Sequence, residues 1–99
     1  MSHTYPQFLF PYSVTCHTND LAVFHCLRAL GHYADPGAPV PDPEHREHQW
    51  RNAGNKLTLC FSSPAYRNKF KDNARRILPQ TLWSVVRESD EVPESALNR

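Results

Sequence analysis

Glycine is scarce in this 99-residue chain, which contains only three: Gly31, Gly37 and Gly54. The sequence therefore lacks a glycine-rich loop that could bind the phosphates of a nucleotide through backbone amides. Cysteine is equally scarce. The chain has three cysteines, Cys16, Cys26 and Cys60. They are too few and too widely spaced for a disulfide framework, and an odd number leaves at least one thiol unpaired. Free thiols within apolar stretches behave as small hydrophobes, a pattern typical of a reducing cytoplasm.

Long hydrophobic runs are also absent. No apolar segment approaches the roughly 20 residues that cross a bilayer. The first residues, Met1–Pro6, lack the basic-then-apolar layout of a signal peptide. We therefore expect a cytoplasmic protein with no membrane partner.

The chain lacks an excess of charge of either sign. Eleven lysines and arginines against ten acidic residues give a formal net charge of +1, which provides no general attraction to nucleic acid or membrane. The hydrophobic content of 39% and charged content of 21% are close to those of globular proteins. This composition predicts a single α+β domain over residues 1–87, followed by a flexible acidic C-terminal tail over residues 88–99.

The first half of the chain contains one strand pattern and one helix pattern. Alternating apolar residues over Phe8–Cys16 predict a half-buried strand. Apolar residues at helical spacing over Leu21–Ala34 predict a helix, with Thr18 or Asn19 as its N-cap. Residues 35–49 hold four of the nine prolines and predict an extended proline-rich loop that is either functional or mobile.

The second half repeats this alternation. Gln49–Arg51 and Lys56–Phe61 predict a hairpin, and Leu82–Arg87 predicts a last strand. Between them lies a helix that begins at Pro64 with Ser63 as N-cap, carries an apolar stripe and stops before Pro79; the stripe is Tyr66, Phe70, Ala74 and Ile77. The element order strand, helix, strand, strand, helix, strand predicts the ferredoxin-like split βαβ fold, in which two helices pack on one face of a four-stranded antiparallel sheet.

The second predicted helix carries most of the clustered positive charge. Arg67, Lys71 and Arg75 are spaced four residues apart and stack along one face, and Lys69 and Arg76 flank them. Such a row could meet an acidic protein surface or nucleic-acid phosphates. It could equally be the solvated outer face of an amphipathic helix, with its charge compensated by the acidic tail.

Tryptophan provides a second candidate for partner binding. Trp50 and Trp83 are most simply core or sheet-edge residues. An exposed tryptophan beside an arginine would instead act as an interface anchor, because these residue types dominate binding hot spots. The Trp50-Arg51 pair next to the proline-rich loop is the preferred anchor.

Catalytic and metal-binding patterns are weak. His45 and His48 have a ligand-like spacing, but structural zinc requires four convergent ligands, and no cysteine pair accompanies them. No pair of carboxylates is placed for acid–base catalysis. The strand Lys56–Phe61 also lacks the aromatic residues with which RNA-recognition sheets stack bases. We therefore expect no metal, no cofactor and no enzymatic activity.

These patterns favour a small non-enzymatic protein-binding module of inhibitor or adaptor type, whose partner has an acidic surface. In size and style alone the chain is similar to phage and mobile-element inhibitors such as anti-CRISPR proteins. The alternative is a nucleic-acid-binding module that places the same basic helix on phosphates, which predicts a steep loss of affinity with rising salt.

Overall fold

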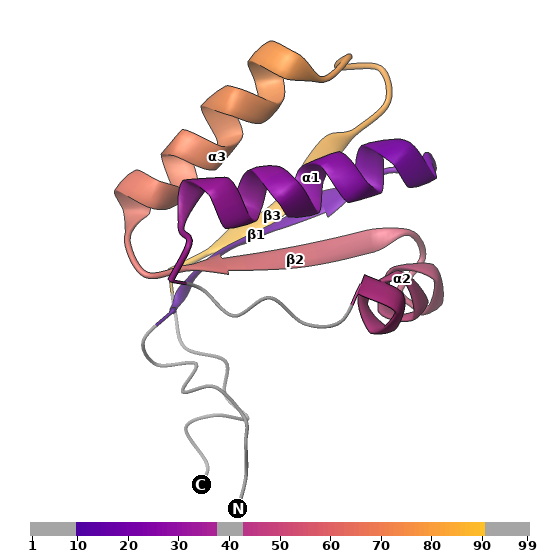
Figure 1. Cartoon of the computed structure of the whole chain (residues 1–99), viewed down its shortest axis with the longest axis horizontal. Helices are drawn as coiled ribbons and strands as arrows, with labels where there is room; N and C mark the ends of the chain where they lie inside the picture. Colours follow the sequence, from indigo (N-terminus) through magenta and orange to yellow (C-terminus); the bar gives the residue numbers. More distant parts are fainter. Residues whose placement is uncertain (1–9, 38–42, 91–99) are drawn as a thin grey trace, which may run out of the picture.

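The chain folds into a three-stranded sheet and three helices. The computed structural model describes residues 10–37 and 43–90 (Figure 1). In chain order the elements are β1 (Tyr12–His17), α1 (Leu21–Ala34), α2 (Pro43–Asn52), β2 (Lys56–Phe61), α3 (Pro64–Ile77) and β3 (Ser84–Ser89). The sheet has the order β2-β1-β3, and both outer strands run antiparallel to the central strand β1. No helix within the described ranges is long and apolar enough to cross a membrane.

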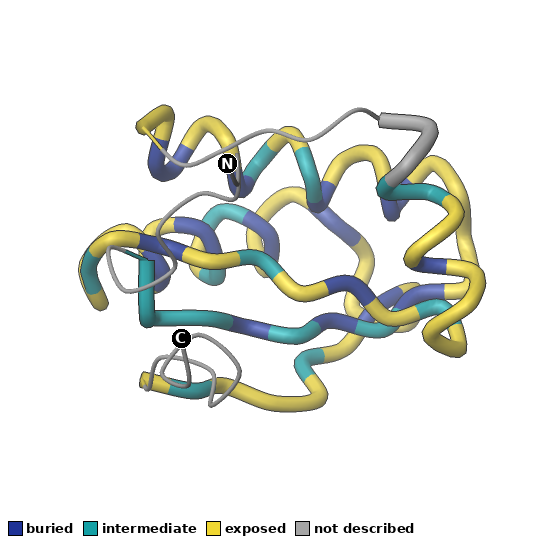
Figure 2. The backbone as a smooth tube through the Cα atoms, turned by 90° about the horizontal axis from the view of Figure 1, so that it is seen from below, coloured by how far each residue is buried: buried dark blue, intermediate teal, exposed yellow. Residues whose placement is uncertain are grey.

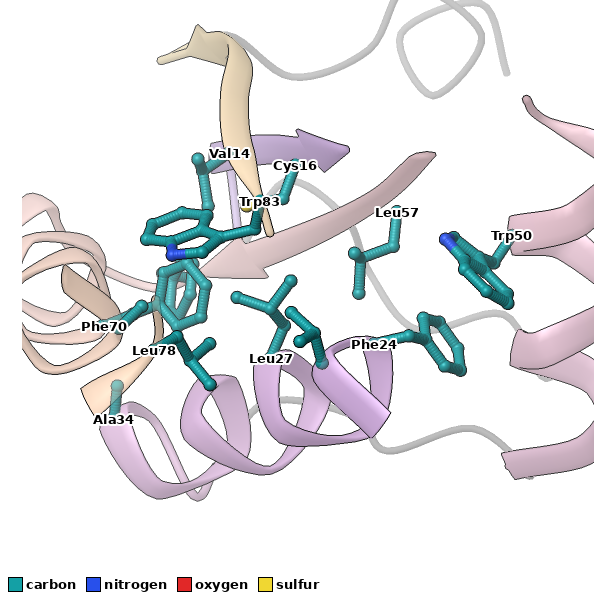
Figure 3. Packing of buried hydrophobic residues seen from close by; sticks show 13 residues of the cluster. Val14, Cys16, Phe24, Leu27, Ala34, Trp50, Leu57, Phe70, Leu78 and Trp83 are labelled. Carbon is teal, nitrogen blue, oxygen red and sulfur yellow. The ribbon is translucent and has the colours of Figure 1, made fainter. Parts of the chain in front are cut away.

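The core lies between the sheet and the pair of helices α1 and α3, which lie side by side over one face of the sheet (Figure 1). Val14 and Cys16 of β1 and Leu57 and Phe61 of β2 point toward these helices. They meet buried residues of the helices and of the segment before β3 (Figure 3), which are Val23, Phe24, Leu27, Ala34, Phe70, Ala74, Leu78 and Trp83. More buried and less buried positions alternate along β1 and β2. Figure 2 shows the backbone coloured by the burial of each residue.

The predicted four-stranded ferredoxin-like sheet is wrong. Gln49–Arg51 does not form a strand but belongs to α2, which leaves three strands and adds a third helix. Part of the predicted extended loop is also helical, because α2 begins at Pro43, where a missing backbone N–H is tolerated. The remaining prolines of that loop include Pro39 and Pro41, which lie outside the described residues.

The strand predicted at Gln49–Arg51 is wrong because a single large apolar residue in a polar segment gives no periodicity from which a strand or a helix could be recognised. Trp50 stacks on Phe24 of α1 with ring centroids 4.7 Å apart, and its indole N–H donates to the Thr18 carbonyl at 3.0 Å. A helix satisfies the backbone of this polar segment internally while it presents one side chain to the core. The docking of Trp50 on α1 therefore determines the conformation, and α2 lies beside β2 where a fourth strand was expected (Figure 1).

Local sequence signals predicted the other elements well. The predicted bounds of α1, β2 and α3 are confirmed, as is Ser63 as the N-cap of α3. The N-cap of α1 is Asp20, whose carboxylate accepts the Val23 N–H at 3.0 Å, rather than Thr18 or Asn19.

The outer bounds of the sheet differ from the prediction. β1 begins at Tyr12, after Pro11, which cannot donate a ladder hydrogen bond. The earlier part of the predicted strand, Phe8 and Leu9, lies outside the described residues. β3 runs from Ser84 to Ser89, so it begins and ends two residues later than the expected Leu82–Arg87.

Candidate interaction surfaces

Arg67, the first member of the predicted basic row, is an internal residue. Its side chain lies under the end of β3, and the residue is 8% exposed. One guanidinium nitrogen donates to the carbonyls of Ser13 and Ser89, at 3.3 and 3.0 Å, and lies 2.6 Å from the Asp90 carboxylate. Its Nε is 3.5 Å from the Glu88 carboxylate. Arg67 therefore joins α3 to both β1 and β3 and is not presented to a partner.

Lys71, the next member, is also engaged within the domain. Its ammonium donates to the Glu88 carboxylate at 2.8 Å, and most of its side chain is buried. Acidic residues at the end of the described chain thus compensate the part of the basic row that faces the sheet. Because Arg67 and Lys71 make these contacts within the domain, they are not available to bind phosphates in the alternative interpretation of α3.

The remaining cations of α3 face outward. Lys69, Arg75 and Arg76 are exposed, and none forms an ion pair with a carboxylate of the described residues. The Lys69 ammonium lies 4.6 Å from the ring centroid of Tyr33 on α1. The Arg76 guanidinium donates to the side-chain carbonyl of Asn73 at 2.7 Å. These three residues leave a positively charged helix face.

Trp50 is part of the core, with 2% of its surface exposed, so the condition that would make it an interface anchor is not met. Arg51 lies over the Trp50 ring, 5.1 Å from its centroid, and pairs with Glu47 at 3.0 Å. Its side chain stays largely accessible. Of the expected Trp50-Arg51 anchor, therefore, only Arg51 is accessible to a partner, and it already pairs with the Glu47 carboxylate.

Several exposed hydrophobic side chains lie on the helical layer, on α1 and α3. Tyr33 is 62% exposed and Ile77 is 55% exposed, and Tyr66 is also exposed. The sequence pattern placed Tyr66 and Ile77 in the apolar stripe of α3, but both lie near the ends of that helix and are exposed. Tyr33 falls outside the apolar stripe of α1, and this was the signal that could have identified it as a surface residue. We call the set Tyr33, Tyr66, Lys69, Arg75, Arg76 and Ile77 the helical-layer surface.

The opposite face of the sheet has a different chemistry. Directly opposed residues of paired strands share a face, so the registers define three rows across the sheet: Lys56-His17-Ser84, Thr58-Thr15-Arg87 and Cys60-Ser13-Ser89. The Thr15 and Thr58 hydroxyls are 2.8 Å apart and hydrogen-bonded. We call these nine residues the open face. The sequence alone did not predict this face, because the alternation of β3 changes at a bulge opposite Thr15 and Cys16.

The helical-layer surface and the open face lie on opposite sides of the domain. No protein-family model matches the sequence, and no curated protein or solved structure matches it. The chemistry of these two surfaces therefore carries the functional argument.

Metal ligands do not converge in the described parts of the chain. Residues 10–37 and 43–90 contain no group of three or more histidine, cysteine or acidic side chains arranged to hold an ion. His48 is exposed on α2, and the side chain of His45 lies outside the described residues.

The cysteines occupy three separate environments. Cys26 is exposed on α1. Cys60 is also exposed, on the open face, and its partial desolvation raises the pKa of its thiol, an effect that Arg46 partly offsets. Cys16 lies in the core, where burial and then the nearby charge of Glu88 raise its thiol pKa to about 12. A neutral, inaccessible thiol is a poor nucleophile.

The raised pKa of Cys16 predicts alkaline destabilisation. Between about pH 9 and pH 12 the unfolded thiol loses its proton while the folded thiol keeps it. The free energy of unfolding should therefore fall, by up to about 1.4 kcal/mol per pH unit. Urea unfolding of the wild type and of Cys16→Ala over this range tests the prediction. The variant should show a shallower decline, and identical slopes would contradict the assignment.

Proposed function

We propose that this protein is a non-enzymatic binding module, of inhibitor or adaptor type, that docks its helical-layer surface on an acidic surface of another protein. The observation that supports this proposal is the exposure of Tyr33, Tyr66 and Ile77 on the same layer as cations without carboxylate partners in the described chain. Large exposed apolar side chains rimmed by polar residues are typical of protein-interaction sites.

The residue types favour a protein partner. Tyrosine and arginine are enriched among binding hot spots, because each combines a large contact area with a polar end. Lys69 packs against the Tyr33 ring, which restricts both side chains before binding. A surface that is already ordered loses less conformational entropy on association.

The charge of this surface indicates the chemistry of the partner. Lys69, Arg75 and Arg76 point outward from α3, whose only acidic residue is Asp72. Carboxylates on the partner would complement these cations and steer the encounter. We expect a partner whose contact region is acidic at its rim and apolar at its centre.

Quantitative affinity capture tests the proposal. The immobilised full chain is incubated with extract of the cells that produce it, and the recovered proteins are quantified by mass spectrometry. The test variant is Tyr33→Ser/Ile77→Ser. The control is Val86→Ser, which removes one apolar side chain of similar exposure from β3 instead (Val86 is 50% exposed). A specific partner should be retained by the wild type and the control and reduced at least about tenfold by the test variant.

A second measurement separates docking from non-specific adhesion. The recovered partner is purified, and its Kd is measured for the wild type, for both variants and for Arg75→Glu/Arg76→Glu. Charge reversal should weaken binding to an acidic surface. Capture of the same proteins at the same yield by all the variants would contradict the helical-layer surface as the docking site.

A further inference from the structure

We propose that the open face of the sheet binds the phosphate backbone of a single-stranded nucleic acid. This inference is independent of the proposed protein interaction, because it concerns the opposite layer of the domain and other residues. Two observations support it: the hydroxyl groups of the open face and its cations.

Hydroxyl groups dominate the open face. They come from all three strands and belong to Ser13, Thr15, Thr58 and Ser84. Serine and threonine hydroxyls, together with lysine and arginine, are regular donors to phosphate oxygens. The hydrogen bond between Thr15 and Thr58 uses one donor and leaves the other hydroxyl able to donate outward.

Positive charge flanks these hydroxyls on both sides. Lys56 lies on β2 and Arg87 on β3, the two outer strands, which are roughly 10 Å apart given the usual spacing of strands. Arg46 of α2 reaches the outer edge of β2, where its guanidinium donates to the Thr58 carbonyl at 2.9 Å. None of the residues that form the open face is acidic. Because the whole chain has a net charge of only +1, attraction of an anion depends on this local arrangement.

The location of the open face on a sheet favours a single strand over a duplex. Its centre consists of small side chains from β1 and β2, namely Ser13, Thr15, Thr58 and Cys60. Reading a duplex requires a helix or ribbon that enters a groove, whereas this face presents the side chains of a three-stranded sheet. Among its nine residues the only aromatic ring is the imidazole of His17, so it has no row of aromatic side chains on which successive bases could stack. Binding should therefore be independent of sequence and sensitive to salt.

Fluorescence anisotropy with a labelled single-stranded oligonucleotide tests the proposal in about 50 mM and about 150 mM salt. The test variant is Lys56→Glu/Arg87→Glu. The matched control is Arg75→Glu/Arg76→Glu, which makes the same change of charge on α3. We expect the test variant to weaken binding at least about tenfold and to reduce the salt dependence, whereas the control keeps most of the affinity.

Thr15→Val tests the hydroxyls separately, because it preserves the side-chain shape and all charges. We expect about a fivefold loss of affinity from this change. Equal losses in the test and control variants would show that charge alone matters and would overturn the assignment to the open face. Absence of binding in low salt would also overturn it, and so would tighter binding of a duplex. Displacement by a phosphopeptide more readily than by an unlabelled oligonucleotide of equal charge would assign the face to a phosphoprotein instead.

Discussion

Replacing Trp50 with alanine is expected to lower the free energy of unfolding by about 3–5 kcal/mol. Trp50 is the only buried residue among positions 46–52 of α2, so its loss removes the main attachment of that helix. The substitution would also leave a cavity beside Phe24 and an unpaired carbonyl at Thr18. Urea unfolding monitored by circular dichroism measures both the stability and the loss of helix.

Two further variants make this result specific. Trp50→Phe keeps a ring against Phe24 but removes the indole N–H, so it should cost less than the alanine variant. Arg51→Ala changes the neighbouring exposed residue and should stay within about 1 kcal/mol of the wild type. If Trp50→Ala were as stable as Arg51→Ala, α2 would not depend on this contact.

Replacing Arg67 with methionine is expected to cost about 2–4 kcal/mol. Methionine keeps the length of the buried stem and removes the guanidinium, so the change isolates the polar contacts. The carbonyls of Ser13 and Ser89 lose a donor, and Glu88 and Asp90 lose their buried counter-charge. Because these contacts join α3 to the end of β3, hydrogen exchange of the β3 amides should also accelerate.

Arg75→Met is the matched control, since it makes the same substitution at an exposed position of the same helix. We expect it to change the stability by less than about 0.5 kcal/mol. Similar unfolding midpoints for the two variants would contradict an internal role for Arg67.

The ion pair of Lys71 with Glu88 affects the choice of binding variants, because replacing Lys71 with glutamate would place two glutamates together and destabilise the domain. Charge reversals that probe binding are therefore made at Arg75 and Arg76.

The two candidate surfaces place different chemistry on the two layers. The helical-layer surface combines exposed apolar side chains with outward cations, whereas the open face combines hydroxyls with cations at its margins. A protein partner and a nucleic acid could therefore be bound at the same time without competing for residues. The two sets of variants share only Arg75 and Arg76. Reversing their charge is a test of the helical-layer surface and a control for the open face.

The sequence by itself determined the elements that depend on local physics. The caps, prolines and helical spacing of α1 and α3 and the alternation of β2 are properties of neighbouring residues, so their bounds could be predicted. The same helical spacing placed five cations on an outer face of α3, which holds for Lys69, Arg75 and Arg76 but not for Arg67 and Lys71.

Only the tertiary structure decided the features that depend on distant contacts. The segment around Trp50 is a helix because the indole docks on Phe24 and Thr18, residues far from it in the sequence. Arg67 lies at helical spacing with Arg75, yet it is buried because the end of β3 passes over it and provides its carbonyl and carboxylate partners. The open face likewise exists only through strand register, since the bulge in β3 sets which of its residues joins Thr15 on that side.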